Sequence, residues 1–312
     1  TADLQPVVQT IYTQLQGVSY TPCRVVIPAC TDIHAGQTVQ IRDRNGNTII
    51  SQHIYGYDSF LYKLEDGKKE SVTKNTEVKA EECDIPYYVD YELSEENVLL
   101  LDMAEFKLKG ENEFSPKEEI LRLDNICREK LSLRSRGGAS VQPWVYGEAP
   151  DVSKVTLRYT FNSEIDYDGA FLGLEDAEKA EITFNGAAVD NTITGNFVDI
   201  SIFKVNLPKI IKGENTLIIT LPCGDSANLE NVFILGNFGV TLEGTSAKIV
   251  SLPEKMGFGD ITGKGFPFYG GNITYRMGDM NTVNGEIEVM IPQYRGALVK
   301  VLVDGEDKGN IV

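Results

Sequence analysis

Apolar and polar side chains alternate along much of the second half of this 312-residue chain. In residues 154–161 the apolar positions are Val155, Leu157, Tyr159 and Phe161, each separated from the next by one polar residue. Successive side chains of a β-strand point to opposite faces of its sheet, so this period of two predicts a strand with one buried face. The alternation therefore favours a sheet in this region.

Further strand-like segments follow at short spacing, and no helical pattern separates them. They are residues 170–174, 180–184, 197–203, 216–221, 232–235, 240–242 and 248–252. Many short strands without intervening helices are typical of a two-sheet sandwich or a jelly roll. We therefore predict an all-β fold of tandem β-sandwich or jelly-roll domains.

The first third of the chain is predicted to hold one N-terminal helix followed by a small β-sandwich. Residues 4–16 place their apolar side chains on one helical stripe. Strand-like runs follow at residues 23–27, 38–43, 47–54 and 87–93. Asn45-Gly46 separates the second and third of these runs, and this dipeptide is a strong signal for a hairpin turn.

The clearest helix signal lies between the two β-rich regions. Residues 97–108 contain an apolar run that predicts a buried strand. Ser115 and Glu118 then form a Ser-x-x-Glu capping box around Pro116. The apolar stripe that follows is Ile120, Leu123, Cys127 and Leu131. We expect a helix that is capped by Ser115 and bridges two β domains, with Cys127 as a buried apolar thiol.

The formal net charge of −17 limits the classes of partner. A chain this acidic repels phosphate backbones and anionic lipid head groups, so we expect no nucleic-acid partner and no membrane partner. No apolar run approaches the roughly 20 residues that span a bilayer. Bacterial extracellular, cell-surface and cytoplasmic locations all stay open.

The cysteines and histidines predict no metal site and no cofactor. The five cysteines are Cys23, Cys30, Cys83, Cys127 and Cys223. No pair of them has C-x-x-C spacing, and the two histidines form no zinc motif. Their odd number leaves at least one thiol free or paired between chains, and a bond between Cys23 and Cys30 stays open. A structural calcium ion, without an assigned site, also stays open.

A short internal repeat bears on the domain organisation. Residues 181–186 and 299–305 each run from an alternating strand into Asn-Gly or Asp-Gly. The first copy continues into a Gly-Glu-Asn turn and another strand, whereas the second does not, so the second is expected to be incomplete. The predicted regions are a helix with a small sandwich (1–96), a strand–helix linker (97–150), a jelly roll (151–253) and the start of a second jelly roll (254–312). We expect them to belong to a longer protein.

Two motifs of the strand-rich region can be compared with known families. They are Lys179-Ala-Glu-Ile-Thr-Phe-Asn-Gly186 and Leu207-Pro-Lys-Ile-Ile-Lys-Gly-Glu-Asn-Thr-Leu217. Both resemble strands of the sugar-binding jelly roll of glycoside hydrolase family 2. Residues 260–275 look like the entry to a second such domain. Residues 97–102 and 136–144 look like the linking region of large bacterial proteins, some of them similar to α-L-rhamnosidases.

The resemblance covers about two thirds of the chain and implies galactose-binding-like domains. It implies an accessory, carbohydrate-associated region of a larger glycoside hydrolase-like protein, with carbohydrate and other domains of the same polypeptide as partners. No catalytic motif of the family is present to carry over, so we assign no catalytic residue and expect no catalytic centre. Two alternatives stay open: a glycoside hydrolase whose paired carboxylates lie within this chain, and an independent carbohydrate-binding module.

Aromatic side chains are the candidates for sugar binding, because flat rings stack on the apolar face of a pyranose. Trp144 and Tyr146 lie in a proline-containing linker, and Phe266, Phe268 and Tyr269 cluster in a loop rich in glycine and proline. Large aromatic side chains more often pack one part of a protein against another. These five residues are therefore candidates either for sugar binding or for packing one part of the protein against another.

Overall fold

The computed structural model describes residues 85–136, 150–225, 228–244, 246–278, 289–291 and 294–311, and the backbone of residues 37–42 and 48–54. The chain divides into two compact units, Thr1–Glu77 with Ile287–Val312, and Val78–Glu286. The predicted helix over residues 4–16, the predicted strand over residues 23–27, and Cys23, Cys30 and Cys83 lie outside the described residues.

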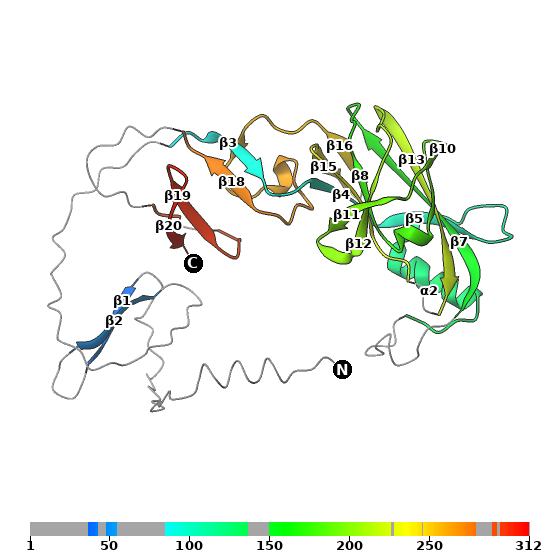
Figure 1. The fold of residues 1–312 in the computed structure, drawn as a ribbon, viewed down its shortest axis with the longest axis horizontal. Helices are drawn as coiled ribbons and strands as arrows, with labels where there is room; N and C mark the ends of the chain where they lie inside the picture. Colours follow the sequence, from blue (N-terminus) through cyan, green and yellow to red (C-terminus); the bar gives the residue numbers. More distant parts are fainter. Residues whose placement is uncertain are drawn as a thin grey trace. The chain divides into compact units, whose positions relative to one another are not determined.

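The larger unit is built on an eight-stranded sheet, which we call the large sheet (Figure 1). Its main path runs β10 (Ala187–Val189), β9 (Glu181–Phe184), β13 (Gly213–Gly224), β7 (Asp151–Ser163), β16 (Ser246–Val250) and β15 (Gly239–Glu243). β5 (Met103–Leu108) also pairs with β7, and β6 (Glu118–Glu119) pairs with β5. The longest pairing is the antiparallel one between β7 and β13.

A five-stranded sheet supplies the second layer. Its order is β11 (Ile193–Phe197), β12 (Asp199–Asn206), β8 (Phe171–Glu175), β14 (Val232–Gly236) and β4 (Asn97–Leu101). All of its pairings are antiparallel. Two neighbouring strands of this sheet, β14 and β4, come from segments far apart in the sequence, so the sheet closes only when the whole unit folds.

The hydrophobic core lies between these two sheets. Leu157 and Ile219 of the large sheet belong to the same buried cluster as Leu172 and Ile234 of the five-stranded sheet. The predicted alternation in β7 is confirmed, because Val155, Leu157, Tyr159 and Phe161 are buried. The unit is therefore an all-β sandwich, as the spacing of its strands predicts.

Two predicted strands differ in detail from the observed ones. Residues 97–108 form two strands, β4 and β5, which belong to different sheets. Residues 197–203 were expected to form one strand, but β11 ends at Phe197 and β12 begins at Asp199. Val198 between them has a φ of 57°, and this left-handed conformation turns the chain into a hairpin.

The helix α2 (Ile120–Lys130) starts later than its capping box predicts. Its N-cap is Glu119, whose carboxylate accepts hydrogen bonds from the backbone N–H groups of Leu121 and Arg122 at 3.0 and 2.9 Å. Glu118 instead pairs in β6, and the Ser115 hydroxyl accepts from the N–H of Phe106. The prediction of Ser115 as the cap is wrong, because the β6 pairing holds the chain extended up to Glu119.

The position of α2 is set by its apolar face. Ile120, Leu123 and Cys127 are fully buried and belong to the core of the sandwich, and the helix lies against β5 and β6. Cys127 is a free buried thiol, as the helical stripe predicts. Cys223 on β13 is also free and buried. The helix therefore forms part of this one sandwich.

A smaller sheet continues from the sandwich. β3 (Tyr88–Leu93) pairs antiparallel with β17 (Met256–Gly257) and with β18 (Ile273–Arg276), and we call this the three-stranded sheet. The connecting segments carry two short 3-10 helices, η1 (Ala177–Lys179) within the sandwich and η2 (Thr262–Lys264) before β18. The division of the chain into four regions stays a prediction.

The described part of the other unit includes two hairpins. β1 (Gln37–Arg42) pairs antiparallel with β2 (Thr48–Ile54), which confirms the hairpin predicted around Asn45-Gly46. β19 (Val299–Val303) pairs antiparallel with β20 (Glu306–Ile311).

The internal repeat is visible in the backbone of two turns. Asn185 and Gly186, between β9 and β10, have φ values of 50° and 81°. Asp304 and Gly305, between β19 and β20, have φ values of 53° and 81°. Two successive positive φ values define a type I′ turn, which matches the twist of an antiparallel hairpin. The shared sequence pattern therefore corresponds to a shared local structure.

The hydroxyl of Tyr159 provides a test of the core. Its ring is fully buried, and its oxygen has no hydrogen-bond partner among the residues that the structure describes. We predict that Tyr159→Phe leaves the free energy of unfolding unchanged or raises it by about 1–3 kcal/mol, because an unpaired buried polar group is removed. Urea denaturation followed by circular dichroism measures this difference.

The matched control is Tyr167→Phe. The Tyr167 hydroxyl accepts a hydrogen bond from the N–H of Asn237 at 2.8 Å, so its removal should cost about 1 kcal/mol. A loss of stability in Tyr159→Phe as large as in the control would show that the Tyr159 hydroxyl does have a partner.

Candidate functional site

The two motifs that resemble the sugar-binding jelly roll meet at one corner of the large sheet. β9 pairs antiparallel with β13, and the Asn185 amide donates to Oδ1 of Asn215 at 2.9 Å. Oδ1 of Asn185 accepts from the N–H of Thr216 at 2.8 Å. Segments that are separated in the sequence are thus joined by a pair of asparagines, which we call the asparagine corner.

Asn215 also closes the turn in front of β13. Its Oδ1 accepts from the N–H of Ile211 at 3.0 Å, and its Nδ2 donates to the carbonyl oxygens of Ile211 and Gly213. The side chain is fully buried, so every one of these bonds satisfies a polar group that water does not reach. The turn therefore explains the Gly-Glu-Asn sequence. Gly213 adopts a φ of 103°, and the Asn215 side chain bonds the backbone on both sides of the turn.

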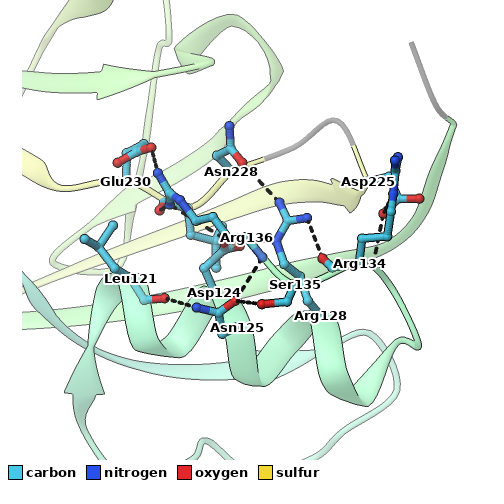
Figure 2. A network of polar contacts seen from close by, with 11 residues as sticks. Leu121, Asp124, Asn125, Arg128, Arg134, Ser135, Arg136, Asp225, Asn228 and Glu230 are labelled. Atoms are coloured by element: carbon cyan, nitrogen blue, oxygen red, sulfur yellow. Dashed lines mark hydrogen bonds and ion pairs between the residues drawn. The ribbon is translucent and has the colours of Figure 1, made fainter. Parts of the chain in front are cut away.

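A second polar cluster lies between α2 and the loop before β14 (Figure 2). Nε of Arg128 donates to Asp124 at 3.0 Å, and both side chains are almost fully buried. Arg128 also donates to the carbonyl oxygen of Arg134 at 3.2 Å and to Oδ1 of Asn228 at 3.1 Å. We call the cluster around this ion pair the arginine network.

Arg136 completes the arginine network from the chain that leaves the helix. Its guanidinium forms an ion pair with Glu230 and lies 3.6 Å from Asp124, and it donates to the carbonyl oxygen of Leu229 at 2.6 Å. Arg128 and Arg136 thus face the carboxylates of Asp124 and Glu230, and Arg134 lies 3.5 Å from Asp225 beside them. These charged groups direct their hydrogen bonds at the protein itself and hold Arg134–Arg136 against residues 228–230. The network therefore joins the chain after α2 to the loop before β14.

The aromatic residues predicted as sugar ligands fall into two groups. Trp144 and Tyr146 lie outside the described residues. The ring of Phe266 is fully buried, whereas Phe268 and Tyr269 are partly exposed. Phe266 makes edge contacts with Tyr91 and Tyr269, at ring-centroid distances of 5.8 and 6.0 Å. Of the three described residues, Phe268 and Tyr269 offer surface to a ligand, and sugar binding by the five residues stays a prediction.

The aromatic cluster joins the three-stranded sheet to the sandwich. The Tyr91 hydroxyl of β3 donates to the carbonyl oxygen of Pro253 at 2.8 Å. Nδ2 of Asn97, at the start of β4, donates to the carbonyl oxygens of Phe238 and Gly265 at 2.7 and 2.8 Å. Because Asn97 is fully buried, these bonds hold the loop that carries Phe266 at a defined position.

The ionisable groups show where charge is compensated. Burial raises the pKa of Glu175, and the neighbouring carboxylate of Asp176 raises it further. Burial alone would raise the pKa of Glu96, but a 2.6 Å hydrogen bond from Lys204 holds it below its usual value. Burial also raises the pKa of the Cys127 thiol to about 12, so this cysteine is protonated at neutral pH.

Within the part of the chain that the structure describes, no three acidic, histidine or cysteine side chains gather as a metal site requires. No described helix has the length and apolar character needed to span a bilayer.

The fold and these contacts define a two-sheet β-sandwich protein with internally paired polar corners. No family model matches the chain, and no curated protein sequence matches it significantly. Two crystal structures of a GH2 β-galacturonidase from Eisenbergiella tayi, bound to glycerol or to galacturonate, show weak structural similarity with TM-scores of 0.28 and 0.29. Each alignment has 12% sequence identity and covers 53% of this chain and 30% of the other chain. A likeness of this extent assigns neither a fold nor an activity.

The arginine network was not predicted from the sequence, although a signal for it exists. Asp124 and Arg128 are four residues apart and lie beside Leu123 and Cys127 on the buried side of α2. Charged residues next to an apolar helical stripe, at ion-pair spacing, indicate a buried ion pair. Arg136, Asn228 and Glu230 join it through tertiary contacts that no local pattern encodes.

Removal of the Arg128 side chain should strongly destabilise the sandwich. Arg128→Ala leaves Asp124 buried without its closest cation, which typically costs about 3–5 kcal/mol. The control is Arg122→Ala on the same helix, whose side chain is 72% exposed and should contribute at most about 0.5 kcal/mol. Chemical denaturation compares the two variants, and equal stabilities would contradict a structural role for the network.

The asparagine corner should contribute through its buried hydrogen bonds. Asn215→Ala leaves the N–H and C=O of Ile211 without their partner, and we expect a loss of about 2–4 kcal/mol in the free energy of unfolding. Asn206→Ala, at an exposed position on β12, should change stability by less than about 0.5 kcal/mol. Thermal unfolding of both variants tests this, and an undisturbed Asn215→Ala protein would rule out the corner as a structural element.

Proposed function

We propose that this chain is an accessory, carbohydrate-associated β-sandwich region of a larger glycoside hydrolase-like protein, without a catalytic centre of its own. The observation that carries the proposal is the asparagine corner. Both motifs that resemble the sugar-binding jelly roll of glycoside hydrolase family 2 take part in it, through Asn185 and Asn215. The residues that carry the resemblance thus include two side chains that hold strands of the sandwich together.

The polar groups of the described sandwich support a role in holding and orienting neighbouring parts. The buried charges of Asp124 and Arg128 pair with each other, and Arg136 pairs with Glu230. A catalytic group needs a free lone pair or proton directed at a substrate. In the arginine network these groups are instead directed at backbone and side chains of the protein, which favours a joint over a reactive site.

Two alternatives each have one observation in their favour. Phe268 and Tyr269 have exposed ring surface, which favours an independent carbohydrate-binding module. Glu175 is a half-buried carboxyl with a raised pKa, a property that general acids of glycoside hydrolases share, and this favours a catalytic role within the chain. A raised pKa also arises where carboxylates simply crowd together, so the accessory role has the stronger support.

Hydrolysis and binding assays on the 312-residue chain separate the three roles. We expect no turnover of aryl glycosides, including galactosides and galacturonides, above the rate in buffer. Turnover that Glu175→Gln abolishes would contradict the proposal and establish a catalytic chain. Calorimetry with millimolar oligosaccharides tests the binding module, for which Phe268→Ala combined with Tyr269→Ala should remove the heat.

A genetic observation tests the accessory role itself. The proposal predicts that the reading frame containing these residues also encodes a glycosidase domain with its own pair of catalytic carboxylates. A reading frame that encodes no such domain would contradict it, whatever the outcome of the binding assays.

A further inference from the structure

The turn between β11 and β12 exposes two large aliphatic side chains. Val198 and Ile200 are each 84% exposed, the highest exposed fractions among the large hydrophobic residues that the structure describes. They lie beyond the part of β12 that pairs with β8, which begins at Ile202. We call residues 196–201 the hairpin tip. Exposed apolar groups of this size are unfavourable in water unless something covers them.

The hairpin tip is braced by its own polar side chains. Nδ2 of Asn196 donates to the carbonyl oxygen of Ile200 at 2.8 Å. The Asp199 carboxylate accepts from the N–H and from the hydroxyl of Ser201, at 2.8 and 2.7 Å. These bonds fix the turn before any partner arrives, which lowers the entropic cost of binding.

The backbone of the tip carries strain. Val198 has a φ of 57°, a left-handed conformation that a β-branched residue rarely adopts. Glycine or asparagine at position 198 would relieve this strain. The sequence instead has valine there, and its aliphatic side chain is exposed to solvent. Strain of this kind concentrates at functional positions.

The apolar surface continues from the tip onto the outer face of the five-stranded sheet. Ile202 lies opposite Glu175 on β8. Gly173, two residues before Glu175 on the same strand, lies opposite Phe233 on β14. A side chain at Gly173 would lie only 3.2 Å from Cβ of Phe233 and 3.5 Å from Cγ2 of Ile202, so these groups form one continuous surface. The ring of Phe233 lies 5.3 Å from that of Phe197, which precedes the tip.

Two carboxylates beside this surface, Glu175 and Asp199, form no ion pair with a cation among the described residues. Asp176 is paired with Lys179 at 2.9 Å. Lys204, opposite Gly173, is paired with Glu96 at 2.6 Å. The cation that acts on Glu175 is Arg136, which is already paired with Glu230 and faces Asp124. An additional basic group would therefore be bound favourably here.

We propose that the hairpin tip binds a short segment of another protein chain that combines apolar and basic side chains. Val198 and Ile200 contact the apolar side chains of this segment, and its basic side chains face Glu175 and Asp199. A second copy of this chain fits less well, since it would bring another chain of net charge −17 and a second set of these carboxylates into contact. A sugar also fits less well, because the polar groups of the tip are bonded to the tip itself and its two most exposed large side chains, Val198 and Ile200, are aliphatic.

The test uses a basic apolar hexapeptide, acetyl-Lys-Leu-Phe-Lys-Leu-Lys-amide, and an acidic twin in which glutamate replaces each lysine. Binding to the 312-residue chain is followed by amide chemical-shift changes. We expect the basic peptide to shift amides of residues 175 and 193–203 and the acidic twin to leave them unchanged. The double variant V198S/I200S should bind the basic peptide about tenfold or more weakly, because it lacks the apolar contacts.

Two matched variants make the test specific. Val152→Ser removes another exposed aliphatic side chain, 57% exposed on β7, and should not affect binding. Glu175→Gln should weaken binding of the basic peptide and reduce its advantage over the acidic twin. The proposal is overturned if V198S/I200S binds as tightly as the unmodified chain, if both peptides shift the same amides equally, or if the shifts map elsewhere. Concentration-dependent dimerisation through the tip, or a galactose-induced shift there, would also overturn it.

Discussion

The long antiparallel pairing of β7 with β13 is the interaction on which the rest of the structure depends. It runs from Asp151 opposite Gly224 to Ser163 opposite Gly213. The other edge of β7 receives β5 and β16, and the other edge of β13 receives β9. Because side chains alternate between two faces, a one-residue slip would expose the core positions of both strands. The position of every neighbouring strand therefore follows from this one register.

Buried polar groups hold the parts of the chain that sheet hydrogen bonds do not reach. Asn215 fixes the turn before β13, Asn97 fixes the loop that carries Phe266, and Asp124 with Arg128 fixes the chain after α2. Each is buried, so its bonds do not compete with water, and loss of one partner would leave the other unsatisfied. Such groups give a protein a defined geometry more than additional stability. That property agrees with the proposed role in orienting neighbouring parts of a larger protein.

Local sequence patterns predicted most strands of the sandwich. They did not predict the helix cap or the buried polar contacts, which depend on residues far apart in the sequence. The alternation from Val155 to Phe161 identified β7, since one residue type at every second position has no other simple explanation. The capping box at Ser115 failed because a tertiary pairing, β6 with β5, outweighed a local preference. The arginine network and the aromatic joint depend on residues such as Asn228 and Gly265, whose roles arise only when distant segments meet. The left-handed turn at Val198 is likewise invisible in the sequence, because Val198, Ile200 and Ile202 alternate with polar residues as they would in one continuous strand.

Native-state hydrogen exchange tests the central role of the β7–β13 pairing most directly. We predict that the paired amides within residues 155–161 and 217–221 exchange only through global unfolding, with the highest protection in the unit. Amides of the three-stranded sheet should exchange through openings of lower free energy. Exchange of the β7 and β13 amides at a lower free energy than those of β3 and β18 would contradict this central role. The β7–β13 pairing would then open while the three-stranded sheet stays closed.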